Sequence, residues 1–219
     1  MSGKRLRKRD ILKKFIIKDN YGTPKVFPFG RGAVVVLSEI SCESSHDDRW
    51  TVFGIHRNDE HPNHAEKKLL QLLQCISSTA RKIDVKLTQN FSPCNLANDE
   101  NGAECAQKIV DYLTTMREEG KEIKMSITFA NFYKTVTYRG NSRDKAKKNQ
   151  EGLQLLHNSG VKLKLLRGKK KWERLLNNEL FVYLTETEKN ACLKEAISEA
   201  REQREDRDII LLEEYLNPE

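Results

Sequence analysis

Apolar residues along this chain recur with two different periods, and the two periods separate strands from helices. Alternating or β-branched apolar runs predict five strands. They cover residues 33–40, 50–55, 83–87, 123–129 and 161–166, and the polar stretch 41–48 would connect the first two as a hairpin. Apolar residues spaced by three and four positions predict helices. These cover residues 11–18, 65–77, 104–118, 145–158, 172–180 and 186–216.

The order of these elements predicts an α/β fold. The strand–helix–strand passage from residue 123 to residue 166 favours a parallel pair of strands with a right-handed crossover. We therefore expect a five-stranded mixed sheet with an antiparallel hairpin at one side, the last two strands parallel and helices on both faces. Because no segment has the glycine, proline or serine content of a linker, we expect a single domain over residues 1–219. A basic extension (1–10) would precede it and an acidic helix (185–219) would end it.

Composition narrows the class of protein. Of the 219 residues 37% are hydrophobic and 32% charged, and the mean hydropathy is −0.70. No apolar run approaches the length of a membrane span, and the first ten residues lack the apolar segment of a signal peptide. We expect a cytoplasmic or nuclear protein that does not contact a membrane. Five cysteines in such a chain argue against a disulfide framework and leave thiols for a metal or for chemistry.

The net charge of +7 is unevenly distributed. Residues 139–174 carry twelve basic and three acidic side chains, whereas residues 179–219 carry five basic and twelve acidic ones. Because the last segment holds −7 of a total of +7, residues 1–178 stand at +14. A body this positive attracts polyanions, of which nucleic acid is the commonest. A solvated lysine-rich surface is the alternative interpretation.

One histidine and two cysteines stand next to predicted helix starts. His64 precedes the helix 65–77, Cys94 follows the third predicted strand, and Cys105 lies at the start of the helix 104–118. One imidazole and two thiolates suit tetrahedral zinc and leave a fourth position for water, whose pKa the metal lowers to about 7. Glu66, two residues after His64, is close enough to take the proton of that water.

Each of these residues also has an ordinary explanation. His64 and Glu66 could simply complement the dipole of a helix start, and the two thiols could be small buried side chains. His56 and His61 are alternative ligands, although neither is at a helix start. The remaining cysteines are interpreted as structural: Cys42, Cys75 and Cys192.

The order His-x-Glu, then Pro-Cys, then Cys is the signature of zinc-dependent base deaminases, and further segments resemble one class of them. Residues 90–94 (Asn-Phe-Ser-Pro-Cys) are similar to the Ser-Trp-Ser-Pro-Cys of that class, and residues 127–133 resemble its fourth strand, which ends in a tyrosine. The helix that starts at Cys105 and the passage from residues 151–156 into Gly160-Val161 are also similar. Over roughly residues 11–180 the chain therefore resembles the AID/APOBEC polynucleotide cytosine deaminases and their invertebrate and lamprey relatives.

The resemblance implies a cytidine-deaminase-like three-layer fold and the hydrolytic deamination of cytosine to uracil. The implied substrate is single-stranded DNA, with RNA as a second candidate. One Zn²⁺ per chain would be held by His64, Cys94 and Cys105, and its hydroxide would attack C4 while Glu66 shuttles protons. The residues implied to contact the substrate are Ala65, Phe91, Ser92, Tyr133 and Arg31. The oligomeric state is left open.

The chain departs from the family pattern at several positions. Ten residues, 95–104, separate the two cysteines, where the family has two to four. A loop of this length can still bring both sulfurs to one metal, because the entropy of closure grows slowly with loop length. Phe91 replaces the usual tryptophan and Asn131 the usual arginine. Residues 134–143 form a longer segment than in most relatives, so the preferred base 5′ of the target does not carry over.

Two other functions share these features. The first is a deaminase of free cytidine or nucleotides, which the predicted helix between the fourth and fifth strands argues against. The second is a zinc-stabilised nucleic-acid-binding module without catalysis, which has no need of Glu66 as a proton shuttle. An adenine deaminase is disfavoured by the resemblance alone.

Overall fold

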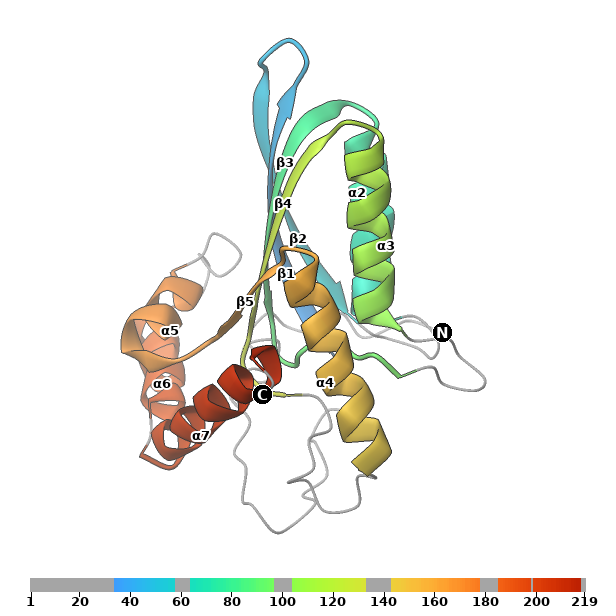
Figure 1. Cartoon of the computed structure of the whole chain (residues 1–219). Helices are drawn as coiled ribbons and strands as arrows, with labels where there is room; N and C mark the ends of the chain where they lie inside the picture. Colours follow the sequence, from blue (N-terminus) through green and yellow to red (C-terminus); the bar gives the residue numbers. More distant parts are fainter. Residues whose placement is uncertain are drawn as a thin grey trace, which may run out of the picture.

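The computed structural model describes residues 34–57, 64–96, 104–132, 143–177, 185–197 and 199–217. The helix predicted over residues 11–18 and the predicted contacts Arg31 and Tyr133 lie outside these ranges. The described elements are β1 (Val35–Ser44), β2 (Arg49–Arg57), α2 (Ala65–Ser77), β3 (Ala80–Gln89), α3 (Cys105–Glu118), β4 (Glu122–Phe129), α4 (Arg143–Asn158), β5 (Lys162–Leu165), α5 (Gly168–Leu176), α6 (Glu186–Ala196) and α7 (Glu199–Leu216) (Figure 1).

The sheet is mixed, as the sequence predicted. Its strand order is β2-β1-β3-β4-β5. Strand β1 pairs antiparallel with β2 and β3, whereas β3–β4 and β4–β5 are parallel. Helices α3 and α4 lie between the parallel strands along the chain, which is the connection that parallel pairing requires. The α/β fold with five strands is therefore confirmed.

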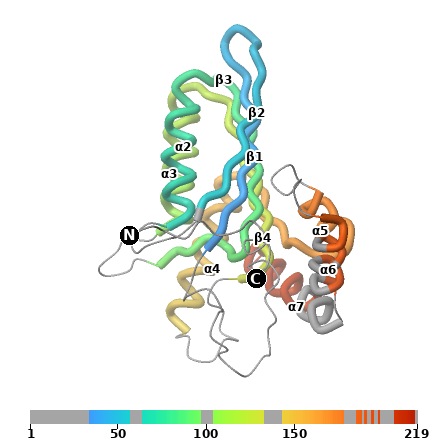
Figure 2. Tube along the Cα trace, turned by 180° about the vertical axis from the view of Figure 1, so that it is seen from behind, coloured from blue at the N-terminus to red at the C-terminus, as the bar shows by residue number. Residues whose placement is uncertain are grey.

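Helices cover both faces of the sheet (Figures 1 and 2). On one face the first core contains residues of α2, α3, α4 and α7, including Leu69, Leu113, Leu153 and Leu212. On the other face the second core is smaller and contains residues of α5, with Trp172 only 1% exposed. Successive residues of β1 alternate between the two cores, as the pleat of a strand requires.

The predicted hairpin turn over residues 41–48 is too long. Strand β1 continues to Ser44, because Cys42 keeps the buried side of the strand and pairs with Trp50 and Ile83. A tight turn follows, in which the Ser44 amide donates to the Asp48 carbonyl at 2.9 Å. Asp47 adopts a left-handed conformation there (φ 63°), which aspartate tolerates better than most residues.

The C-terminal segments differ from the sequence prediction in two places. The helix predicted over 172–180 begins earlier and ends earlier, at Gly168–Leu176. The single helix predicted over 186–216 is two helices, α6 and α7. Leu193 of α6 packs against the second core, whereas Leu212 of α7 belongs to the first. Because these cores lie on opposite faces of the sheet, one straight helix cannot serve both.

Within the described ranges no helix combines the length and the apolar character that a membrane crossing would need.

The candidate site residues that the structure describes gather at one edge of the sheet. Strands β3 and β4 end there, at Gln89 and Phe129, and helix α2 begins on the same side (Figure 1). Polar side chains that follow parallel strands commonly meet at this edge.

Candidate metal centre

His64 lies immediately before helix α2 and directs its side chain away from the helix end. Its backbone is extended (φ −67°, ψ 149°), and its carbonyl accepts the amide of Lys67 at 3.0 Å, so the helix begins at Ala65. The His64 side chain makes no capping hydrogen bond. His64 therefore occupies the position before the first turn of α2, but its side chain does not cap the helix.

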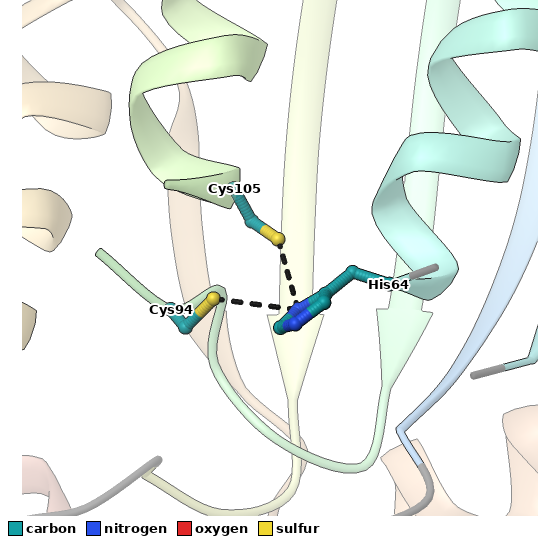
Figure 3. A group of neighbouring side chains, drawn as sticks. All are labelled: His64, Cys94 and Cys105. Atoms are coloured by element: carbon teal, nitrogen blue, oxygen red, sulfur yellow. Dashed lines mark hydrogen bonds between the residues drawn. The ribbon is translucent and has the colours of Figure 1, made fainter. Parts of the chain in front are cut away.

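Cys94 and Cys105 meet at the imidazole of His64, although ten residues separate them in sequence (Figure 3). The Nδ1 atom of His64 is 3.5 Å from the Sγ atom of Cys94 and 3.3 Å from the Sγ atom of Cys105. The two segments are also joined through the backbone, where the Ala106 amide donates to the Cys94 carbonyl at 3.0 Å. Both cysteines are buried.

The spacing of these three atoms fits zinc. All three ligand atoms lie within 4.8 Å of one another. Tetrahedral zinc with Zn–S of about 2.3 Å and Zn–N of about 2.0 Å places a sulfur and a nitrogen about 3.5 Å apart. The observed separations of 3.3 and 3.5 Å match that value. Borderline-soft nitrogen and sulfur donors also match zinc in chemistry, so these residues could hold one such ion.

The two thiols share their protons unequally. A hydrogen bond with the Cys105 side chain lowers the pKa of Cys94 to about 4, and His64 adds to this effect. The same bond to Cys94, together with burial, raises the pKa of Cys105. The pair therefore loses its first proton readily, and the second is the one that a metal cation must displace.

Glu66 is the buried acid of the site. Its side chain is 2% exposed, and the Cys105 thiol donates to its Oε2 atom at 3.6 Å. Burial raises the pKa of Glu66 to about 7, and the negative charge of Cys94 acts in the same direction. A carboxyl with this pKa can both accept and release a proton at neutral pH.

Two asparagines that the sequence interpretation did not assign to the site hold the segment before Cys94. Asn90 accepts the Val35 amide at its Oδ1 atom (2.8 Å), which ties this segment to β1. The Asn131 side-chain amide donates to the Asn90 backbone carbonyl at 2.7 Å, and the Asn131 backbone carbonyl accepts the Ser92 amide at 2.8 Å. Asn131, where the pattern that the sequence resembles has an arginine, is fully buried and acts inside the scaffold.

Helix α4 holds the residue after Cys94. The buried side chain of Asn149 accepts the Asn95 amide at its Oδ1 atom, at 3.0 Å. Three residues further along the helix, Gly152 leaves room for the same segment. A Cβ atom at Gly152 would lie 2.3 Å from the Cβ atom of Asn95 and 3.2 Å from that of Ala106. A glycine inside a helix was the available sequence signal for this close approach.

The predicted substrate contacts that fall in the described ranges lie around the metal centre in different environments. Ala65 and Ser92 are buried, and Phe91 is partly buried against the first core. Arg31 and Tyr133 lie outside the described residues.

The two alternative ligands, His56 and His61, are not among the described residues that form the cluster. His56 lies in β2, where its Nε2 atom pairs with the Ser38 hydroxyl at 3.0 Å. His64, Cys94 and Cys105 form the one metal-sized group of His, Cys, Asp and Glu side chains in the described ranges, and His56 is not part of it. His61 lies outside those ranges.

The other cysteines lie apart from the centre. Cys42 is buried in the first core, whereas Cys75 is exposed on α2 and contributes nothing to the core. The side chain of Cys192 is outside the described part of the chain.

A search of protein-family models and a search of curated proteins found no match to this chain.

Proposed function

We propose that this protein is a zinc-dependent deaminase that converts cytosine to uracil in single-stranded nucleic acid, with DNA favoured over RNA. One observation carries the proposal: a buried carboxyl group, Glu66, lies 3.6 Å from one sulfur of a His-Cys-Cys cluster whose separations suit zinc. A purely structural zinc site gains nothing from a buried acid beside it, because desolvation of the carboxylate costs free energy.

The reaction needs an activated water molecule and a group that moves protons. Zinc in a site with three protein ligands supplies the first as a Lewis acid. Glu66 supplies the second: it accepts a proton from the attacking water, passes it to the ring nitrogen N3, and transfers a further proton to the departing amine. Cytosine and water then yield uracil and ammonia. With its pKa near 7, Glu66 is poised for transfer in both directions.

Two observations favour a polynucleotide over a free nucleoside as substrate. The described chain has α4 between two parallel strands, β4 and β5, and a helix at this place argues against a deaminase of free cytidine or nucleotides. The sequence also holds +14 over residues 1–178, a charge that suits a phosphate backbone.

The test compares substrates and two carboxyl variants. Zinc-loaded protein is incubated with single-stranded DNA, with RNA and with free cytidine, and uracil or uridine is measured. The Glu66→Gln variant should keep its zinc and lose at least about 100-fold in rate, as expected for loss of a general acid–base group. Glu104→Gln is the matched control, because Glu104 is exposed at the start of α3 and makes no capping hydrogen bond.

The outcomes separate the candidate functions. Product from cytidine but not from DNA or RNA would favour a nucleoside deaminase. Zinc binding without product from any substrate would refute the deaminase and leave the nucleic-acid-binding module. Equal rates for Glu66→Gln and Glu104→Gln would remove Glu66 from the mechanism.

A further inference from the structure

Helix α4 has a buried side and a strongly basic exposed beginning. Ala146, Asn149 and Leu153 are buried. The first six residues of the helix, 143–148, contain four cations and one anion, and all five charged side chains are exposed. The positive end of the helix dipole lies at the same place and adds to their potential.

Two of these cations have no partner within the part of the chain that the structure describes. Neither Lys147 nor Lys148 has an ion pair or a side-chain hydrogen bond with any residue of the described ranges. By contrast, Glu43 forms ion pairs with three cations, Arg49 and Arg81 at 3.1 Å and Lys82 at 2.6 Å. Unpaired exposed cations remain available to an external anion.

The basic start of α4 is next to the metal centre. Lys148 directly precedes Asn149. The Oδ1 atom of Asn149 accepts a hydrogen bond from the amide of Asn95, the residue after Cys94, at 3.0 Å. Lys148 and Gly152 are four residues apart and so share one stripe of the helix. Gly152 contacts the same segment, as the 2.3 Å distance from its added Cβ to Asn95 shows. A nucleic-acid strand bound along this helix start therefore passes beside the segment that carries Cys94 and Asn95.

Helix α5 is equally basic but is placed differently. Trp172, Leu175 and Leu176 attach it to the second core, on the opposite face of the sheet from α2, α3 and α4 (Figure 2). One of its cations, Lys169, has an ion-pair partner in Glu173 at 3.8 Å. Among the described residues of the basic stretch, the cations of α4 and those of α5 thus lie on opposite faces of the sheet, and α4 is the helix of the two that adjoins the candidate metal centre.

We propose that the cations at the start of α4, Arg143, Lys147 and Lys148, bind the phosphate groups of the single-stranded nucleic acid beside the metal centre. This inference rests on the proposed function, since it names the surface that holds the substrate strand. Each cation that contacts a phosphate of a single strand contributes about 0.7 to the slope of log K against log salt concentration.

The test neutralises one pair of lysines on each helix. Binding of a fluorescein-labelled oligothymidylate is measured by anisotropy over about 50 to 200 mM salt. The variant Lys147→Gln/Lys148→Gln is compared with Lys169→Gln/Lys170→Gln on α5, since lysine and glutamine have similar helix propensities. All proteins carry zinc, and no turnover occurs because oligothymidylate contains no cytosine.

The α4 variant should lower the salt slope by about 1.4 and weaken binding about 25-fold at 0.1 M salt, with unchanged zinc content. The α5 variant should change the affinity less than about threefold. Equal losses in both variants, an unchanged slope in the α4 variant, or no binding by the unsubstituted protein would overturn the inference. The deaminase proposal is tested separately, by product formation. If the protein forms no product but loses nucleic-acid binding only in the α4 variant, the deaminase proposal fails and the binding surface on α4 stands.

Discussion

Replacing Gly152 by alanine should destabilise the protein, although the same change inside most helices stabilises it. Alanine normally gains about 1 kcal/mol over glycine in a helix interior. Here the new Cβ atom would lie 2.3 Å from the Cβ atom of Asn95, and carbon atoms in contact lie about 3.5–4.0 Å apart. Neither atom is the end of a flexible side chain, so α4 and the segment after Cys94 must move apart by about 1 Å.

The magnitude follows from two opposing terms. Overpacking of this kind costs about 1–3 kcal/mol, which offsets the helix-propensity gain of about 1 kcal/mol and leaves a net loss of up to about 2 kcal/mol. The movement also stretches the 3.0 Å hydrogen bond from the Asn95 amide to Asn149. Because Asn95 directly follows Cys94, zinc affinity should fall by about 10-fold, the lower end of the effect of losing a group that orients a ligand.

Urea unfolding measures the first effect, and competition with a zinc chelator measures the second. Glu151→Ala is the matched control, because Glu151 is the exposed neighbour on the same helix and its replacement leaves the Asn95 contact intact. A Gly152→Ala protein that is more stable than the unsubstituted chain, with unchanged zinc affinity, would refute the close approach of α4 to the segment after Cys94.

Three further predictions concern the scaffold, a buried histidine and a ligand. Asn131→Ala should cost about 1–3 kcal/mol in urea unfolding, because it leaves the buried Asn90 carbonyl without its donor at 2.7 Å; an unchanged midpoint would contradict this. Burial lowers the pKa of His56 from 6.5 to about 4. Between these pH values the unfolded chain binds a proton at this histidine that the folded chain does not. The free energy of unfolding should therefore fall by at most about 3 kcal/mol as the pH drops from 6.5 to 4. His56→Gln should remove most of that fall in unfolding curves at the two ends of the range, and an equally steep fall would point to other groups. Cys105→Ser should lose most bound zinc by elemental analysis while Cys75→Ser, an exposed control, keeps it; equal zinc in both would require another ligand.

The parts of the fold that were predicted correctly depend on near neighbours in the chain. The helix 65–77 was predicted with the bounds that α2 has, because its apolar residues repeat with the helical period and face a single core. The long terminal helix was wrong for a complementary reason. Its pattern is helical throughout, but Leu193 and Leu212 pack into cores on opposite faces of the sheet, and that division is not encoded in local periodicity.

For the candidate metal centre, the sequence by itself determined the residue types and the places of His64, Glu66 and Cys105 at the starts of helices. The His-x-Glu pair at the start of α2 and the cysteine that opens α3 were identifiable without coordinates, because the chemistry of zinc restricts which side chains can serve. Only the tertiary structure decided that Cys94 meets Cys105 across ten residues, and that the Asn90–Asn131 pair holds this loop in place. The physical reason is that such hydrogen bonds connect groups 41 residues apart in the chain, and which side chains meet depends on how β3, β4 and α4 pack.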